Sequence, residues 1–202
     1  MALGLAVSPR GACHNRSGAY EADFSGEVDR LRADSGRGAL VAASEDFASV
    51  LDSLIVCKFL RKCFTDFYGE AAELLNKVTG WDFSAGELRR IGERIQISKR
   101  LFNEREGWRP ADDWLPPRLL GEALPTGVAQ GVVLTTDELK EMIGSYYHAR
   151  GLDENGFVPG KKLQELELFK PPAEGVKSWE IKAIVLDRAI AIADHNGPDF
   201  SR

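Results

Sequence analysis

The sequence contains only three cysteines, and no two of them have the CxxC spacing of a self-contained zinc or iron–sulfur site. This odd count does not indicate a disulfide framework. No apolar run reaches the roughly 18 residues of a membrane span, because Lys58, Arg61 and Lys62 interrupt the best candidate. The formal net charge of −5 argues against non-specific binding to nucleic acid. The N-terminus lacks the features of a signal peptide, so we expect a cytoplasmic protein.

Apolar residues recur at the spacing of an α-helix along much of the chain, and they predict an all-α fold with an irregular multihelical arrangement. Gly80 is placed to end one of these helices. Residues 84–87 have the pattern of a capping box at the start of the next helix. Helices are predicted over residues 44–60, 67–78, 84–102, 135–151, 163–168 and 178–193.

Glycine and proline divide the rest of the sequence into connecting segments. Residues 1–38 are rich in Gly, Ser and Arg and predict mostly loop with short structured pieces, and the prolines within 107–131 exclude a long helix there. Residues 130–134 form a candidate short strand. The composition changes after a pair of consecutive prolines, so we expect a main domain at 1–170 and an extra C-terminal helix or tail at 171–202.

A loop near the N-terminus carries the first residues that could do chemistry. In this loop His14 follows Cys13, and Arg10 lies a few residues earlier. A histidine beside a cysteine and an arginine fits a proton-transfer group or a thiolate site. The alternative is a loop histidine that only hydrogen-bonds the backbone, and the residues alone leave both interpretations open.

Asp52 and Cys57 are the second candidate pair. Asp52 lies in an apolar helical segment, and burial of a carboxylate is costly unless another group pairs with it. Cys57 follows five residues later, so the two side chains do not share one face of a regular helix. The alternative is a satisfied core aspartate with an inert buried cysteine. We interpret Cys63 as a core residue and the charged stretch 87–106 as a solvated helix face.

Six strings resemble those of one enzyme family, the aldehyde:ferredoxin oxidoreductases. Their order and spacing agree with the family pattern over roughly residues 5–168. Six matches in the right order are specific, although each string alone would be weak. The strings are SPRGACH (8–14), DSLIVC (52–57), LLNKVTGW (74–81), IGERI (91–95), LFNEREG (101–107) and DDWLPPRL (112–119).

The resemblance implies a cofactor and roles for four residues. In this family two pterin dithiolenes hold a tungsten or sometimes a molybdenum atom (tungstopterin or molybdopterin), beside a four-iron, four-sulfur (4Fe–4S) cluster. Asp52 would hydrogen-bond a pterin, and Cys57 would be the fourth thiolate ligand of the cluster. His14 would lie near the metal and transfer the substrate's proton, and Arg10 of the same loop would bind the cofactor.

Two departures from the family pattern limit what this chain could do alone. Ile55 replaces a glycine of the motif that contains Asp52 and Cys57, and the family's N-terminal cofactor domain with its CxxC-x3-C run is absent. We therefore expect the C-terminal part of an enzyme that oxidises aldehydes to carboxylic acids and passes electrons to ferredoxin. Its partners would be the missing N-terminal and middle domains and ferredoxin, and the isolated chain would be inactive.

Two alternatives to this function remain open at the level of the sequence. The chain could be a helical scaffold or interaction module that keeps the family's packing motifs without catalysis. It could also be a fragment of a related tungsten enzyme that reduces aromatic thioesters. Neither the composition nor the six strings separate these alternatives from the aldehyde oxidation.

Overall fold

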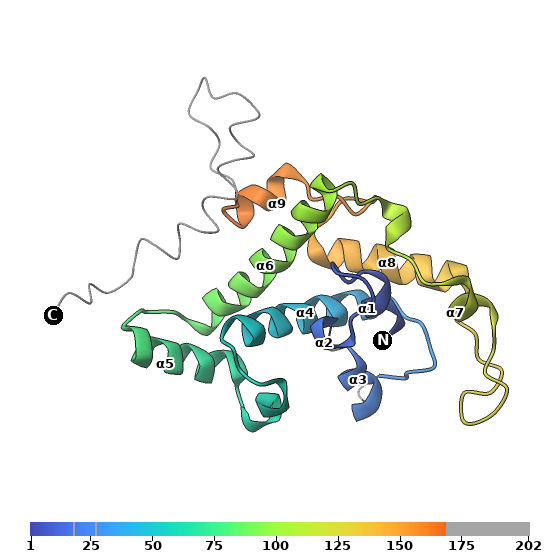
Figure 1. The fold of residues 1–202 in the computed structure, drawn as a ribbon, viewed down its shortest axis with the longest axis horizontal. Coiled ribbons are helices and arrows are strands. Elements are labelled where there is room, and N and C mark those ends of the chain that lie inside the picture. The colour runs from blue at the N-terminus through green and yellow to red at the C-terminus, as the bar shows by residue number, and fades with distance from the viewer. Residues whose placement is uncertain (18, 27, 169–202) are drawn as a thin grey trace, which may run out of the picture. The chain divides into compact units, whose positions relative to one another are not determined.

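The structure is a computed structural model that describes residues 1–17, 19–26 and 28–168 (Figure 1). The chain divides into two units, Met1–Pro159 and Gly160–Arg202. Within the described residues every regular element is a helix, which confirms the predicted all-α fold. The elements of the first unit are α1 (Ala2–Ala6), α2 (His14–Ser17), α3 (Tyr20–Ser25), α4 (Arg37–Ser53), η1 (Lys58–Cys63), α5 (Phe67–Thr79), α6 (Ala85–Arg105), η2 (Pro110–Asp112), α7 (Pro117–Gly121) and α8 (Thr136–Arg150). The second unit contains α9 (Gly160–Glu165).

Helix α4 is the centre of the first unit, because α2, α6 and α8 all pack against it. Two glycines let the helix backbones approach closely. A Cβ atom added to Gly38 of α4 would lie 2.3 Å from the carbonyl carbon of Ser145 in α8. A Cβ atom added to Gly92 of α6 would lie 2.6 Å from the carbonyl oxygen of Asp46 in α4. Neither position has room for a larger residue, so α4 is fixed between α6 and α8.

A buried ion pair strengthens the crossing of α4 and α8. The Glu45 side chain of α4 is 1% exposed, and its Oε2 accepts hydrogen bonds from Arg150 Nη2 at 2.8 Å and Tyr146 Oη at 2.7 Å. Arg150 also pairs with Asp46. Burial raises the pKa of the Glu45 carboxyl, and the positive charge of Arg150 opposes this shift. Removing one member of a buried pair typically costs about 3–5 kcal/mol, so this cluster holds α8 on α4.

Two apolar cores lie along α4. The first joins α1 and α8 to the N-terminal half of α4, with Val41 and Leu139 among its buried residues. The second joins α5 and α6 to the C-terminal half, with Leu51, Phe67 and Leu88 at its centre. Only the final two residues of α4 lie beyond this second core, and they are exposed at the protein surface, where the predicted site residues lie.

The helix ends read from the sequence are confirmed at three places. Ser84 begins α6 with a reciprocal capping box, in which the Glu87 N–H donates to Ser84 Oγ at 3.2 Å. Thr135 begins α8 in the same way. Gly80 ends α5 in the left-handed conformation, with φ at 74°. In each case a residue with one conformational or hydrogen-bonding role decides where the helix begins or ends.

The helix predicted at 44–60 is wrong at both ends. Helix α4 begins earlier, at Arg37, because small residues continue the helix where the apolar pattern is sparse. It ends at Ser53, where the backbone turns into a left-handed conformation at Ile55. The apolar residues beyond this turn belong to the separate 3-10 helix η1, so their helical spacing does not continue α4.

The C-terminal half of the chain also differs from the prediction. No strand forms at 130–134, where Gln130 makes only an isolated bridge with Leu124, because an isolated strand has little stability. Helix α9 begins at Gly160, before the expected 163–168, and the helix predicted at 178–193 lies outside the described residues. Among the residues that the structure describes, no helix is long and apolar enough to cross a membrane.

Candidate functional site

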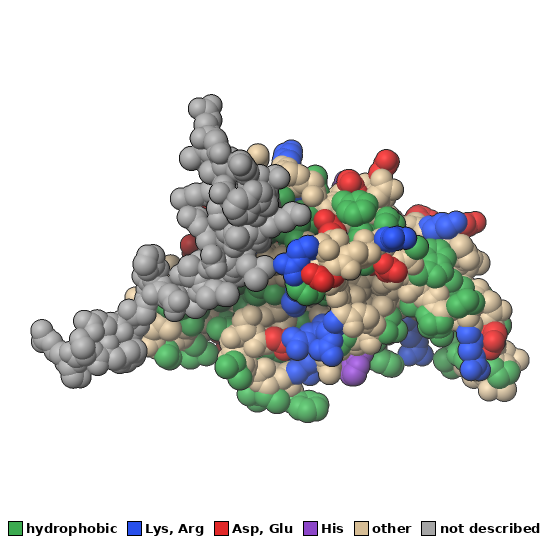
Figure 2. All heavy atoms as spheres, turned by 45° about the horizontal axis from the view of Figure 1, so that its top comes forward, with side chains coloured by type: hydrophobic (Ala, Val, Ile, Leu, Met, Phe, Trp, Pro, Cys, Tyr) green, Lys and Arg blue, Asp and Glu red, His purple; other side chains and the backbone are tan. Residues whose placement is uncertain are grey.

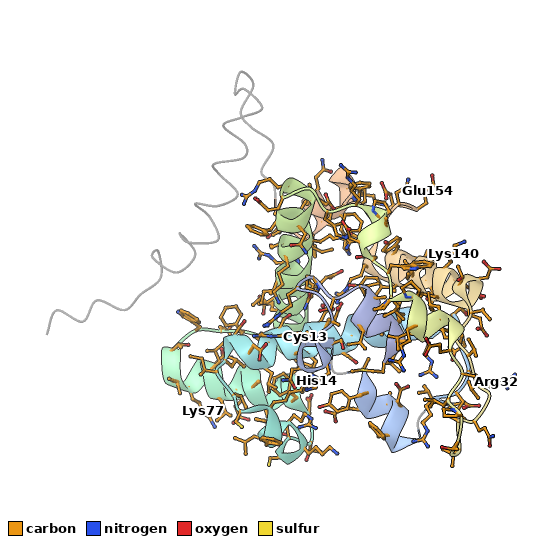
Figure 3. All side chains as sticks on the ribbon, turned by 45° about the vertical axis from the view of Figure 1, so that its right-hand side comes forward. Cys13, His14, Arg32, Lys77, Lys140 and Glu154 are labelled. Carbon is orange, nitrogen blue, oxygen red and sulfur yellow. The ribbon has the colours of Figure 1, made fainter. Side chains whose placement is uncertain are left out.

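The structure brings together the two segments that carry the predicted site residues. Helix α2, which begins at His14, packs on α4, and Figure 3 shows Cys13 and His14 where the N-terminal segment passes over that helix. The Arg16 guanidinium of α2 forms an ion pair with the Asp52 carboxylate in the last turn of α4. The loop that contains Arg10 and His14 is therefore tied directly to the motif that contains Asp52 and Cys57.

Helix η1 makes a second connection between the same segments. The Lys58 ammonium donates to the carbonyl oxygen of Asn15 and lies 5.6 Å from the centre of the Tyr20 ring. Arg61 pairs with Glu21 of α3. Burial lowers the pKa of Lys58, and the nearby charge of Arg61 adds to this effect. Several independent contacts thus hold the surface around Asp52 and Cys57 in one arrangement.

Asp52 is not the buried carboxylate that its apolar neighbours predict. Its side chain is 40% exposed, because the preceding residues Val50 and Leu51 face the core and Asp52 faces α2 at the surface. Only one of its carboxylate oxygens, Oδ2, pairs with Arg16. The other oxygen has no partner among the described residues, so it can accept hydrogen bonds from a ligand.

The thiol and imidazole groups of the site are accessible as well. Cys57 is a free cysteine at the start of η1 and is exposed, as are His14 and Arg10. Cys63 is also exposed, so its interpretation as a core residue is wrong. The physical reason is the same for both cysteines: the segment after α4 leaves the helix and follows the surface, whereas a continued helix would have turned part of it inward.

Positive charge surrounds this part of the surface. Burial is the main cause that lowers the pKa of Lys99 in α6, and the positive charges of Arg16 and Arg10 lower it further. Figure 2 shows Lys and Arg side chains gathered beside a histidine on the face that it draws. A surface of this kind attracts anionic groups, including the neighbouring Asp52 carboxylate.

Ile55 has an unusual backbone conformation between Asp52 and Cys57. Its φ angle is 56°, in the left-handed region, and the Val56 N–H donates to the Leu51 carbonyl oxygen at 3.1 Å to close the end of α4. The Ile55 side chain is 92% exposed. For an L-residue this conformation costs about 1–2 kcal/mol, and a glycine, as in the family motif, would avoid that cost.

Replacing Ile55 by glycine should stabilise the isolated chain. We expect Ile55→Gly to raise the free energy of unfolding by roughly 0.5–1 kcal/mol, because relief of the left-handed strain exceeds the added entropy of the unfolded glycine. Chemical denaturation measures the difference. Ile55→Ala is the matched control, because it retains Cβ and hence the strain. Equal stabilisation by both variants would show that the backbone at this position is not strained.

The described residues do not form a complete metal site by themselves. No group of three or more His, Cys, Asp or Glu side chains in the described part of the chain could hold a metal ion. A 4Fe–4S cluster needs four thiolates, and Cys57 offers one of them at an open surface. The residues therefore fit a cluster shared with a second polypeptide segment and do not fit one assembled on this chain alone.

These observations define a class of protein: a multihelical domain that carries its predicted site residues together on one exposed surface. Residues 1–168 match the family model described as aldehyde ferredoxin oxidoreductase, domains 2 & 3, and the chain belongs to this family. The resemblance carried by the six strings is thereby confirmed. The individual roles of His14, Arg10, Asp52 and Cys57 and the boundary near residue 170 stay predictions.

Curated relatives give the same family and show how much of the enzyme this chain covers. The tungsten-containing aldehyde ferredoxin oxidoreductase of Pyrococcus furiosus is 36% identical over 168 residues, and that of Pyrococcus horikoshii is 35% identical over 173 residues. The two matches cover 81% and 82% of this chain. The chain spans only about 27% of the length of each relative.

Arg16, Lys58 and Arg61 are functional candidates that the sequence reasoning missed. Each of them lies inside or beside one of the two motif segments, but nothing in the order of the residues indicates which partner it contacts. The sequence contained only a weak indication of a role for Arg16, which follows the predicted site residue His14 by two positions. Its partner Asp52 is 36 residues away in the sequence, so only the fold reveals the ion pair.

Proposed function

We propose that this chain is the C-terminal part of a tungsten- or molybdenum-pterin aldehyde:ferredoxin oxidoreductase and acts only together with the rest of that enzyme. The assembled enzyme converts an aldehyde and water into a carboxylic acid, two protons and two electrons, and ferredoxin accepts the electrons. One observation supports this proposal most directly. The Arg16–Asp52 ion pair joins the segment that directly follows the first family string to the motif that contains Asp52, at an exposed surface.

Asp52 is the residue that we assign to recognition of a pterin. Its free carboxylate oxygen accepts hydrogen bonds from ring N–H and amino groups, which are the donors that a pterin offers. Arg16 holds the other oxygen and thereby limits the rotation of the side chain. Arg10, exposed at the same surface, contributes positive charge toward an anionic cofactor.

Cys57 is the residue that we assign to the shared cluster, as its fourth thiolate ligand. The remaining three thiolates come from the part of the enzyme that lies outside this chain. When bound, the tungsten or molybdenum cofactor and the cluster supply the oxygen-transfer and electron-transfer chemistry. The contribution of this chain is to position the pterin-binding carboxylate on α4, which packs closely on α6 and α8, and the thiolate at the start of η1, just after that helix.

His14 is the residue that we assign to proton transfer. Its imidazole is exposed at the start of α2, on the same segment as Arg16, and an imidazole in this position can exchange a proton with a bound substrate. The reaction releases two protons for each aldehyde, so a group that accepts a proton beside the reacting carbon accelerates it.

Metal analysis of a co-expressed complex tests the proposed function. The chain is produced anaerobically together with the polypeptide that precedes the matching segment in the Pyrococcus furiosus relative. We expect tungsten and about four iron atoms for each complex, and neither metal in the chain produced alone. A stable complex without either metal would support the non-catalytic interaction module instead. Colour and iron in the isolated chain would contradict the division of the site.

A further inference from the structure

Three cationic side chains connect the N-terminal segment of the chain with the end of α4 and with η1. Arg16 of α2 pairs with the carboxylate of Asp52, and Arg61 of η1 pairs with the carboxylate of Glu21 in α3. The third cation is Lys58, the first residue of η1. Two of the three positive charges are thus paired with carboxylates, whereas the charge of Lys58 is not.

The partners of the Lys58 ammonium in the described part of the chain are uncharged. The ammonium donates to the backbone carbonyl oxygen of Asn15 and lies 5.6 Å from the centre of the Tyr20 ring. The nearby carboxylate of Glu21 is already held by Arg61. Lys58 is also partly buried, so water screens its charge less than that of an exposed lysine. A carbonyl dipole and an aromatic face fix the ammonium in place without cancelling its charge.

The position of this charge beside Cys57 points to a role for Lys58. The two residues are consecutive, so their Cα atoms are about 3.8 Å apart. Net charge and hydrogen bonding around a 4Fe–4S cluster set its reduction potential. We propose that Lys58 raises the reduction potential of the shared cluster through its unpaired positive charge. The inference rests on the proposed function, because it takes Cys57 as a ligand of that cluster.

The direction of the effect follows from Coulomb's law. Uptake of one electron makes the charge of a cluster more negative by one unit, and a fixed positive charge nearby favours that reduced state. Lys58 therefore makes the cluster a better acceptor for each of the two electrons that aldehyde oxidation releases. The paired cations contribute less, because the negative charge of each carboxylate offsets the positive charge of its partner.

Lys62 provides a matched control for Lys58. Both lysines belong to η1, but Lys62 is exposed and lies five residues from Cys57, so solvent screens its charge. Methionine is the neutral replacement at both positions, because its unbranched apolar side chain retains most of the packing of the lysine stem. Lys58→Arg is a second control, since it keeps a positive charge that can donate to a carbonyl oxygen.

A redox titration of the co-expressed complex, followed by electron paramagnetic resonance, measures the potential. Wild-type chain, Lys58→Met, Lys58→Arg and Lys62→Met are each produced anaerobically with the polypeptide that precedes the matching segment in the Pyrococcus furiosus relative. We expect the midpoint potential of the cluster to shift to a more negative value in Lys58→Met. It should stay at the wild-type value in Lys58→Arg and Lys62→Met. All four complexes should contain about four iron atoms, because Cys57 is intact.

The outcomes separate the charge of Lys58 from its structural contacts and from the proposed function. An unchanged potential in Lys58→Met would overturn the inference, and so would an equal shift in Lys58→Arg or Lys62→Met. Loss of iron in Lys58→Met would show that Lys58 maintains the cluster site and does not set its potential, which also overturns the inference. If the wild-type complex contains no iron, the proposed function fails, and the inference fails with it.

Discussion

Replacement of Cys57 by alanine should remove most of the iron from the co-expressed complex while leaving the fold of the chain intact. A 4Fe–4S cluster that loses one of four thiolates is no longer fully ligated and is readily lost. The fold should tolerate the change because the Cys57 side chain is exposed and belongs to neither apolar core. Iron analysis of the purified complex, together with circular dichroism of the chain alone, measures the two outcomes.

Cys63→Ala is the matched control for this experiment. Cys63 is a free, exposed cysteine at the other end of η1, so its removal changes the same chemistry in the same short helix. We expect the Cys63→Ala complex to keep its iron. Full iron retention in Cys57→Ala would refute the ligand assignment, and equal loss in both variants would show a general sensitivity of η1.

Replacement of His14 by alanine should have the second large effect, on turnover and not on metal content. We expect the rate of aldehyde oxidation by the assembled enzyme to fall by roughly 10²–10⁴-fold, the range for loss of a positioned acid–base group. Tungsten and iron should stay at wild-type levels, because His14 is not assigned as a ligand. Steady-state kinetics with matched metal analysis measures both quantities.

His148→Ala provides the control for His14. His148 is an exposed histidine in the last turn of α8, and no site role is assigned to it. Its replacement should leave turnover unchanged. If His14→Ala also leaves turnover unchanged, His14 is a loop residue without a catalytic role. If His14→Ala loses tungsten, the residue contributes to cofactor binding and not only to proton transfer.

The sequence predicted those parts of the fold that depend on local signals. Ser84 and Gly80 have roles that a few neighbouring residues determine, and the structure places both as predicted. The end of α4 was missed because apolar spacing continues through Phe59, although the backbone leaves the helix near Ile55. Periodicity alone does not distinguish a continued helix from an exposed segment outside the helix.

The sequence names candidate site residues, whose roles stay predictions, but it does not predict how they are arranged. The resemblance to the family singled out Asp52 and Cys57, whereas the apolar context of Asp52 wrongly suggested burial. Burial depends on which face of α4 meets another helix, and this is a property of tertiary packing. The Arg16 ion pair follows from the same packing, so no pattern within either motif could have predicted it.

The glycine contacts of α4 have a consequence for the position of the candidate site. Gly38 and Gly92 place the α4 backbone against α8 and α6 with no space for sliding. The Asp52 carboxylate near the end of α4 therefore keeps one position relative to α6 and α8.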